Sequence, residues 1–173
     1  MIGVVNILPF DKKDIDELVT LVNSAYRGES SKKGWTTEAD LLDGTRTDVA
    51  SIQSLVERPG SAILVCRNEQ NLIVGCVHLQ KENDSMYLGM LTVSPEMQAM
   101  GIGKKLLHAG EVHATQMECD AVVMTVIDTR KELIAWYIRH GYIPTGETKP
   151  FPANPSFGIP LQPLQFIVFK KKL

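Results

Sequence analysis

Two adjoining stretches decide the fold: Tyr87–Pro95, with the sequence YLGMLTVSP, and Gln98–Leu107, with the sequence QAMGIGKKLL. Together they predict a buried strand, a tight glycine turn and a helix that begins directly after the turn. The start of a helix leaves about four backbone N–H groups without intrahelical partners and carries a partial positive charge. Glycines at such a start let an anion approach the backbone closely. The pattern therefore predicts a turn that binds a pyrophosphate.

Two other kinds of phosphate-binding loop do not fit this spacing. A Walker A loop requires a glycine and a Ser or Thr where this chain has Gln98 and Lys105. A dinucleotide fingerprint requires a third glycine at the position of Leu106, and it normally lies in the first strand–helix unit of its domain. An ordinary left-handed turn between a strand and a helix would also contain two glycines, so the interpretation depends on the rest of the chain.

The remaining pattern is Q/R-x-x-G-x-G/A after a strand, which Gln98, Gly101 and Gly103 match. It resembles the acyl-CoA loop of the GNAT superfamily of N-acetyltransferases. A second stretch, LIAWYIRHGY, begins at Leu133, about 30 residues further on, and is similar to the family segment LY-x-x-x-GF. Both signatures occur in the order expected for the family, and the resemblance extends over nearly the whole chain.

In this second stretch, Tyr137, Gly141 and Tyr142 are in register with the family segment. The resemblance assigns to Tyr137 the role of the general acid that protonates the departing CoA thiolate. The chain departs from the family pattern seven residues earlier, where an asparagine is common and Arg130 is present instead. That difference weakens the transfer of cofactor contacts at this position but does not affect the tyrosine.

Composition limits the remaining possibilities. The chain has 173 residues, 44% of them hydrophobic, which fits a single domain over 1–173. A net charge of −2 gives no electrostatic reason to expect nucleic acid or an anionic membrane as a partner. No signal peptide or spanning segment is expected. Cys66, Cys76 and Cys119 fit reduced core thiols, which predicts a cytoplasmic protein, and no metal site is expected.

Hydrophobic periodicity and turn residues divide the chain into short alternating elements. With the family resemblance, this order implies an α/β (α+β) GNAT fold, with a mixed, mostly antiparallel sheet of about six to seven strands flanked by helices. The resemblance also implies a pair of strands that splay apart at the cofactor groove. The expected strands are Val4–Leu8, Ala62–Arg67, Leu72–Gln80, Ser85–Val93, Ala121–Ile127, one from Tyr142, and Leu164–Lys170. The expected helices run from Asp11 or Asp14 to Arg27, from Thr36 or Thr37 to Leu42, from Asp48 to Val56, from Gly103 to Met117, and from Arg130 to His140.

The resemblance implies an N-acetyltransferase that moves an acetyl group from acetyl-CoA to a primary amine of a small molecule or an amino-terminal acceptor. The amine would attack directly in a ternary complex, with Tyr137 as general acid. The cofactor would be bound mostly by backbone groups of the protein. The implied cofactor-binding residues are Leu91, Thr92, Val93, Gln98, Met100, Gly101, Ile102, Gly103 and Lys104.

The group that accepts the proton of the amine stays open at this stage. His78 titrates in a useful range, although a lone histidine in a strand is more often structural. Glu38 and Asp40 lie in the region that lines the acceptor channel in this family, but they could equally be carboxylates in the first turn of a helix. A chain of water molecules would also suffice.

Trp35, Glu38 and Asp40 are the candidate acceptor-binding residues. They belong to the stretch Gly34–Asp48, whose indole, acids and one guanidinium, that of Arg46, could clamp a small polar amine. A capped surface helix with one packed tryptophan explains them equally well. The proline-rich stretch 144–163, with Phe151 and Phe157, is long for a loop and could cover the acceptor or mediate a homodimer contact. Two other functions stay open: a non-catalytic acyl-CoA-binding or regulatory module, and an α/β enzyme that uses another nucleotide.

Overall fold

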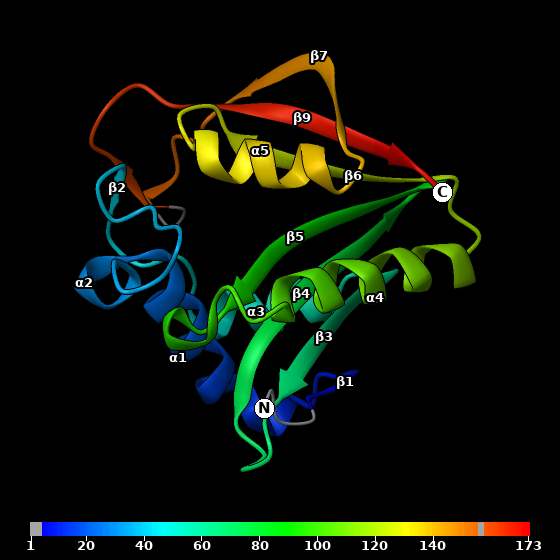
Figure 1. Cartoon of the computed structure of the whole chain (residues 1–173), viewed down its shortest axis with the longest axis horizontal. Coiled ribbons are helices and arrows are strands. Elements are labelled where there is room, and N and C mark those ends of the chain that lie inside the picture. The colour runs from blue at the N-terminus through cyan, green and yellow to red at the C-terminus, as the bar shows by residue number, and fades with distance from the viewer. Residues whose placement is uncertain (1–4, 156–157) are drawn as a thin grey trace.

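The computed structural model describes residues 5–155 and 158–173, and its centre is a seven-stranded sheet (Figure 1). The strand order is β1-β3-β4-β5-β6-β9-β7, in which β5 and β6 are parallel and the other neighbours are antiparallel. The predicted mixed, mostly antiparallel sheet is confirmed. Its strands are β1 (Asn6–Pro9), β3 (Ser61–Arg67), β4 (Ile73–Glu82), β5 (Ser85–Val93), β6 (Ala121–Ile127), β7 (Ile143–Pro150) and β9 (Gln165–Lys172).

Helices cover both faces of this sheet. A cluster beneath α1 and α3 buries Leu18, Val22 and Ile52 against β3, β4 and β5. A larger cluster on the other face joins α4 and α5 to the sheet, with Leu106 and Tyr137 among its members. The helical bounds are η1 (Lys12–Asp14), α1 (Ile15–Tyr26), α2 (Gly28–Ser31), α3 (Val49–Val56), η2 (Pro95–Met97), α4 (Ile102–Gln116) and α5 (Lys131–Arg139). In the described ranges, no helix is both long enough and apolar enough to cross a membrane.

The predicted strand, glycine turn and helix are confirmed. Strand β5 ends at Val93, and α4 begins at Ile102. Gly101 precedes the helix in the left-handed conformation, with φ of 81°, which glycine adopts without steric penalty. Continuous burial of β5 was expected, but its buried residues alternate with half-buried ones. Its half-buried residues from Tyr87 to Val93 line the cavities described below.

Strands β5 and β6 pair only along the first part of their length. Ser85–Tyr87 are in register with Ala121–Val123, and the two strands then diverge (Figure 1). On the other side of β5, a bulge shifts the register with β4 between Cys76 and His78, and Met90 has a positive φ of 52°. The resulting opening leaves the second half of β5 without a strand neighbour towards β6. This is the splayed pair that the family resemblance implied.

Two local expectations were wrong. No helix forms between Thr36 and Leu42, where the chain makes turns and the short strand β2 (Leu42–Asp43). The stretch 144–163 is not one long loop, because β7 occupies it up to Pro150 and β8 (Ile159–Pro160) follows. Strand β1 begins at Asn6, and Val4 and Phe157 lie outside the described residues.

Strands β2 and β8 form a separate two-stranded antiparallel sheet, in which Leu42 pairs with Pro160 and Asp43 with Ile159. This small sheet joins the segment after α2 to the segment before β9. The two stretches that the sequence marked as acceptor-side candidates are therefore neighbours in space.

Candidate active site

A first cavity of about 150 Å³ lies between the end of β5 and the start of α4. The structure brings most of the predicted cofactor residues together along its wall. Ile102 does not line it, because its side chain is buried in the core, and Met100 does not line it either. The predicted cofactor residues that do line it are Leu91, Thr92, Val93, Gln98, Gly101, Gly103 and Lys104.

The start of α4 is open to this cavity. Gly101 provides no side-chain cap, and its carbonyl accepts the N–H of Lys105 at 3.1 Å as the first helical hydrogen bond. A Cβ at Gly103 would lie 3.7 Å from both Val93 and Trp136, so the missing side chain keeps a passage open between them. Uncapped N–H groups beside such a passage fit a bound phosphate group.

Gln98 shapes this cavity through contacts with the protein itself. Its Oε1 atom accepts the backbone N–H of Trp35 at 2.5 Å and that of Thr36 at 3.4 Å, and its Nε2 donates to the carbonyl of Val93 at 3.1 Å. A Cβ at Gly34 would collide with this amide group. The Gln98 side chain thus fastens the segment before β2 to the end of β5, and its predicted direct contact with the cofactor stays a prediction.

The hydrogen bond from the Trp35 backbone to Gln98 also determines where the Trp35 side chain lies. The indole is 47% exposed and lines the first cavity with the glycine turn, and it is not among the residues that line the second cavity. The sequence assigned Trp35 to the acceptor side. The structure instead places the indole beside the glycine turn, where Gln98 holds the Trp35 backbone.

A second cavity, of about 260 Å³, lies where β5 and β6 splay apart. Residues 87–91 of β5 and 124–127 of β6 form two of its walls. Phe151 forms another and stacks on Phe166, with ring centroids 5.4 Å apart. Phe151 was a candidate for the acceptor site, and the structure places it in this cavity together with Glu38.

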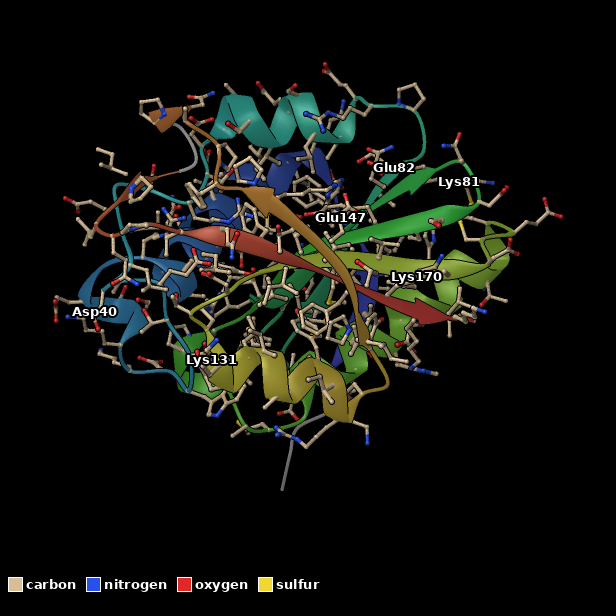
Figure 2. The ribbon with its side chains drawn as sticks, turned by 90° about the horizontal axis from the view of Figure 1, so that it is seen from above. Asp40, Lys81, Glu82, Lys131, Glu147 and Lys170 are labelled. Atoms are coloured by element: carbon tan, nitrogen blue, oxygen red, sulfur yellow. The ribbon has the colours of Figure 1, made fainter. Side chains whose placement is uncertain are left out.

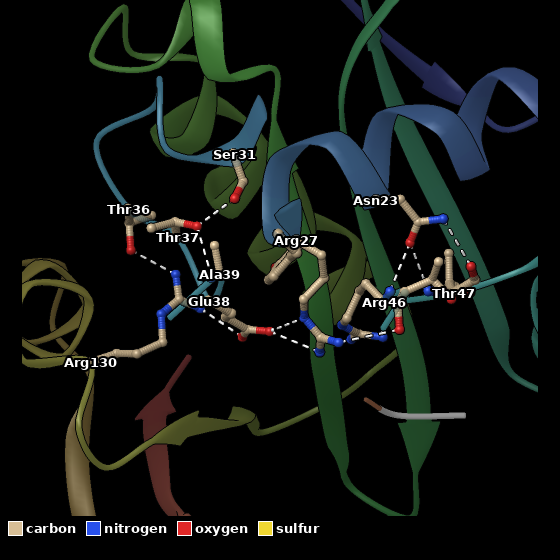
Figure 3. A network of polar contacts seen from close by, with 12 residues as sticks. Asn23, Arg27, Ser31, Thr36, Thr37, Glu38, Ala39, Arg46, Thr47 and Arg130 are labelled. Carbon is tan, nitrogen blue, oxygen red and sulfur yellow. Dashed lines mark hydrogen bonds and ion pairs between the residues drawn. The ribbon is translucent and has the colours of Figure 1, made fainter. Parts of the chain in front are cut away.

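Glu38 lies at the centre of a buried network of charged side chains (Figure 3). Its Oε1 accepts from Nε of Arg27 at 3.1 Å, and its Oε2 accepts from Nη1 of Arg130 at 2.9 Å. Arg130 also donates to the hydroxyl of Thr36 at 2.6 Å. The interpretation of Glu38 as a carboxylate in the first turn of a helix was wrong, because this part of the chain is organised by the two arginines and not by a helix.

Two other candidate residues lie away from both cavities. Asp40 is on the periphery, where it pairs with Lys32 at 3.4 Å and its side chain is 79% exposed (Figure 2). His78 is buried in β4 and shares a hydrogen bond of 3.0 Å with the hydroxyl of Ser61. Burial lowers the pKa of His78 to about 4, and nearby arginines add to this effect. Neither residue lines a cavity, so the structure does not bring Asp40, a candidate for binding the acceptor and for the base, or His78, a candidate for the base, to the site.

Five residues line both cavities and therefore mark the place where they meet: Tyr26, Leu91, Arg130, Leu133 and Tyr137. The hydroxyl of Tyr26 donates to the carbonyl of Leu91 at 2.6 Å, and burial raises its pKa to about 12. Burial also raises the pKa of Tyr137. The Tyr137 hydroxyl therefore carries its proton at neutral pH.

Sequence reasoning missed Tyr26 and Arg27 as residues of this site, whereas Arg46 was expected on the acceptor side and lines the second cavity. Tyr26 ends α1 and reads as the last apolar position of a helical stripe. Arg27 directly follows α1 and precedes a polar region, where arginines are usually solvated. The one signal in the sequence for this charged network was Arg130. It stands where the family commonly has an asparagine, and in the structure it forms a buried ion pair with Glu38.

An open glycine turn at the start of a helix, beside two splayed strands, defines the acyl-CoA N-acyltransferase class of fold. A family model described as "Acetyltransferase (GNAT) family" matches residues 15–142, and the chain belongs to this family. Over 149 residues it is 27% identical to the Uncharacterized N-acetyltransferase YjhQ of Escherichia coli (strain K12), covering 83% of this chain and 72% of that protein.

Solved structures agree with this fold. The ribosomal-protein-S18-alanine N-acetyltransferase from Escherichia coli superposes with a TM-score of 0.72 at 12% identity, covering 98% of this chain and 94% of that one. An acetyltransferase of the GNAT family from Staphylococcus aureus gives 0.71 at 18% identity, covering 98% and 99%. A structure from Bacillus anthracis, in complex with acetyl coenzyme A, gives 0.57 at 17% identity over 70% of this chain and 67% of that one.

Proposed function

We propose that this protein transfers an acetyl group from acetyl-CoA to a primary amine of a small molecule or of an amino terminus. The observation that carries this proposal is the position of Tyr137. Its side chain lines both the cavity at the glycine turn and the cavity between the splayed strands. A donor bound in the first cavity and an amine bound in the second would meet beside this hydroxyl. Family membership and the acetyl coenzyme A complex of a similar structure support the choice of donor.

The residues around the first cavity fit the donor. The uncapped first turn of α4, at Ile102, Gly103 and Lys104, would hold the pyrophosphate through backbone N–H groups. The end of β5 that lines this cavity, Leu91 to Val93, would offer its backbone to the pantetheine arm. Acetyl-CoA supplies an activated thioester. The protein itself therefore has to orient the two reactants and transfer the protons.

Acyl transfer to an amine requires two proton movements. The nitrogen must attack as the neutral base, although a lysine-like amine is mostly protonated at pH 7. The departing sulfur must then gain a proton, and Tyr137 is the proposed donor because its side chain lines both cavities and its hydroxyl is protonated at neutral pH.

The removal of the proton from the amine is assigned to water. Both carboxylate oxygens of Glu38 already accept hydrogen bonds from arginines. Asp40 and His78 lie outside the cavities. Water that enters the second cavity is therefore the proposed acceptor of this proton.

Two measurements test the proposed function. Thermal unfolding with acetyl-CoA, CoA, ATP and NAD should show stabilisation by the two CoA species alone, by about 2.7 kcal/mol at 100 times the dissociation constant. A panel of amines is then tested for release of the CoA thiol. Release with at least one amine supports catalysis. Stabilisation by CoA species without release from any amine would favour a non-catalytic acyl-CoA-binding module, and stabilisation by ATP or NAD would exclude the proposal.

A further inference from the structure

The second cavity is rich in positive charge. Arg27, Arg46 and Arg130 line it, and Glu38 is the one carboxylate among its described lining residues. Three arginines against one glutamate leave a formal excess of two positive charges around this space. The cavity therefore favours an anionic group over a cationic one.

Glu38 is already used by two of the three arginines. It bridges Arg27 and Arg130, which lie on either side of it (Figure 3). Its single negative charge is therefore shared between Arg27 and Arg130. The remaining cation of the cavity is Arg46.

Arg46 is held in place without a carboxylate. Its backbone N–H donates to the side chain of Asn23 at 2.8 Å, and its guanidinium lies 5.4 Å from the ring centre of Tyr26. Among the described residues, no carboxylate is within ion-pairing distance of its guanidinium. The two acids closest to it in the chain have other roles, since Asp48 caps α3 through Ser51 at 2.7 Å and Asp43 accepts the N–H of Gly44 at 3.2 Å.

The neighbouring charge is of the same sign. The Arg46 side chain lies beside Arg27 (Figure 3), and its charge contributes to lowering the pKa of Arg27, after the larger effect of burial. Arg27 has its counter-charge in Glu38, so an anion bound in this cavity would offset the charge of Arg46. The planar donors of a guanidinium group match the oxygens of a carboxylate or phosphonate.

We propose that the amine accepted by this enzyme also carries an anionic oxygen group, such as a carboxylate, which Arg46 binds in the second cavity. The acceptor is then a small amino acid or a related zwitterion. The inference rests on the proposed function. It replaces the expectation from the sequence that acidic residues attract a cationic acceptor, because Asp40 lies outside the cavity and Glu38 is neutralised by its two partners.

The charge does not belong to the donor site. Arg27 and Arg46 line the second cavity and are not among the residues lining the first, where α4 begins. Tyr137 lines the same cavity as Arg46. An acceptor whose acid group is fixed by Arg46 would thus have its amine in the compartment that contains the proposed proton donor.

The test compares matched pairs of amines that differ only in this charge. Amino acids with the amine at the α, β or γ position are assayed for thiol release beside their carboxamides, at equal concentrations of acetyl-CoA. The acids should react with a kcat/KM about 10 to 100 times higher than their amides, the range expected for a charged hydrogen-bonded pair. Binding of the same pairs to the acetyl-CoA-free protein is measured by calorimetry, so that the preference is tested even without turnover.

Variants assign the effect to one residue. Arg46→Gln should raise KM for the acid to that of its amide, with kcat less affected, while Arg46→Lys should restore part of the preference. Arg139→Gln, which removes an exposed arginine of α5, should behave as wild type. Equal reaction and equal binding of acids and amides by the wild type would overturn the proposal. So would a preference that survives in Arg46→Gln. Thiol release from amides alone would reject this inference and keep the proposed function, whereas acid-selective binding without any release would reject the function and keep the anion site.

Discussion

Glu38 and Arg130 are 92 positions apart in the chain, yet their side chains form an ion pair of 2.9 Å that is almost fully buried. The pair joins the segment before β2 to the residue that precedes α5. It lies at the wall where the two cavities meet, since Arg130 lines both of them. The same carboxylate also pairs with Arg27 at 3.1 Å, so one side chain organises three parts of the site.

Loss of this carboxylate should destabilise the protein strongly. Glu38→Gln leaves two buried guanidinium groups without a counter-charge, and we expect the free energy of unfolding to fall by about 3–5 kcal/mol. Asp40→Asn removes a carboxylate two positions away that is exposed, and it should change stability by less than about 1 kcal/mol. Urea unfolding of both variants measures the contrast. Equal stabilities of the two variants would show that the pairing with Glu38 contributes little.

The role of Tyr137 can be separated from that of its neighbour Tyr142. Tyr137→Phe should lower kcat by roughly 10²–10⁴ and leave acetyl-CoA affinity nearly unchanged, because only the proton donor is lost. Tyr142 packs against Tyr137 with ring centroids 5.8 Å apart, but it lines neither cavity. Tyr142→Phe should therefore keep kcat close to that of the wild type. An unchanged kcat in Tyr137→Phe, where chemistry limits the rate, would make Tyr137 a structural residue.

Gly103 should be required for the donor more than for folding. Gly103→Val places a branched side chain at the open start of α4, and we expect acetyl-CoA affinity to fall by at least about tenfold, or 1.4 kcal/mol. His108→Val introduces the same branched residue at an exposed position of α4 and controls for its effect on the helix. Calorimetry gives the affinities, and thermal unfolding checks the fold. Affinity within twofold of the wild type in a folded Gly103→Val protein would mean that the phosphate site lies elsewhere.

The position of Trp35 leads to a prediction opposite to the one that its sequence context favours. Because the indole lines the first cavity, Trp35→Ala should weaken acetyl-CoA binding by about fivefold, which corresponds to about 1 kcal/mol of lost apolar contact. The KM for the acceptor amine should stay unchanged. Steady-state kinetics with each reactant varied in turn distinguishes the two effects. A higher KM for the acceptor with unaltered acetyl-CoA affinity would return Trp35 to the acceptor side.

His78 should make stability depend on pH in the acidic range. Its pKa is lowered to about 4 in the folded protein, mainly by burial, whereas an unfolded histidine titrates near 6.5. Between these values the unfolded state binds more protons, so stability falls as pH is lowered from about 6.5 to 4, by about 3 kcal/mol in total. His78→Gln should lack this loss, while a variant of the exposed His108 should retain it. Denaturant unfolding at several pH values across the window measures the difference, and parallel curves for wild type and His78→Gln would contradict the prediction.

The sequence was most informative where local chemistry determines the backbone. The turn before α4 could be predicted because Gly101 adopts a left-handed conformation that few other residues tolerate. The start of α3 was predictable because Asp48 caps it through its own side chain. Neither feature depends on distant parts of the chain.

The acceptor side could not be predicted in this way. Residues 36–42 have polar and helix-compatible composition, but Gln98 and Arg130 hold their backbone and side chains in another conformation. These contacts join positions more than sixty residues apart, and no local pattern contains them. The excess positive charge of the second cavity also depends on contacts between distant residues. Glu38 pairs with Arg27 and Arg130, and Arg46 is the third arginine that lines this cavity.

The small sheet of β2 and β8 has a consequence for redesign of this enzyme. Leu42 and Asp43 belong to one acceptor-side stretch, and Ile159 and Pro160 belong to the other, so their backbone pairing makes the two stretches a single interchangeable unit. The seven-stranded sheet and the turn before α4 do not take part in that pairing. A graft of new substrate specificity from a relative should succeed only if both stretches are transplanted together with Gln98, which holds Trp35 and Thr36 of the first stretch against the end of β5.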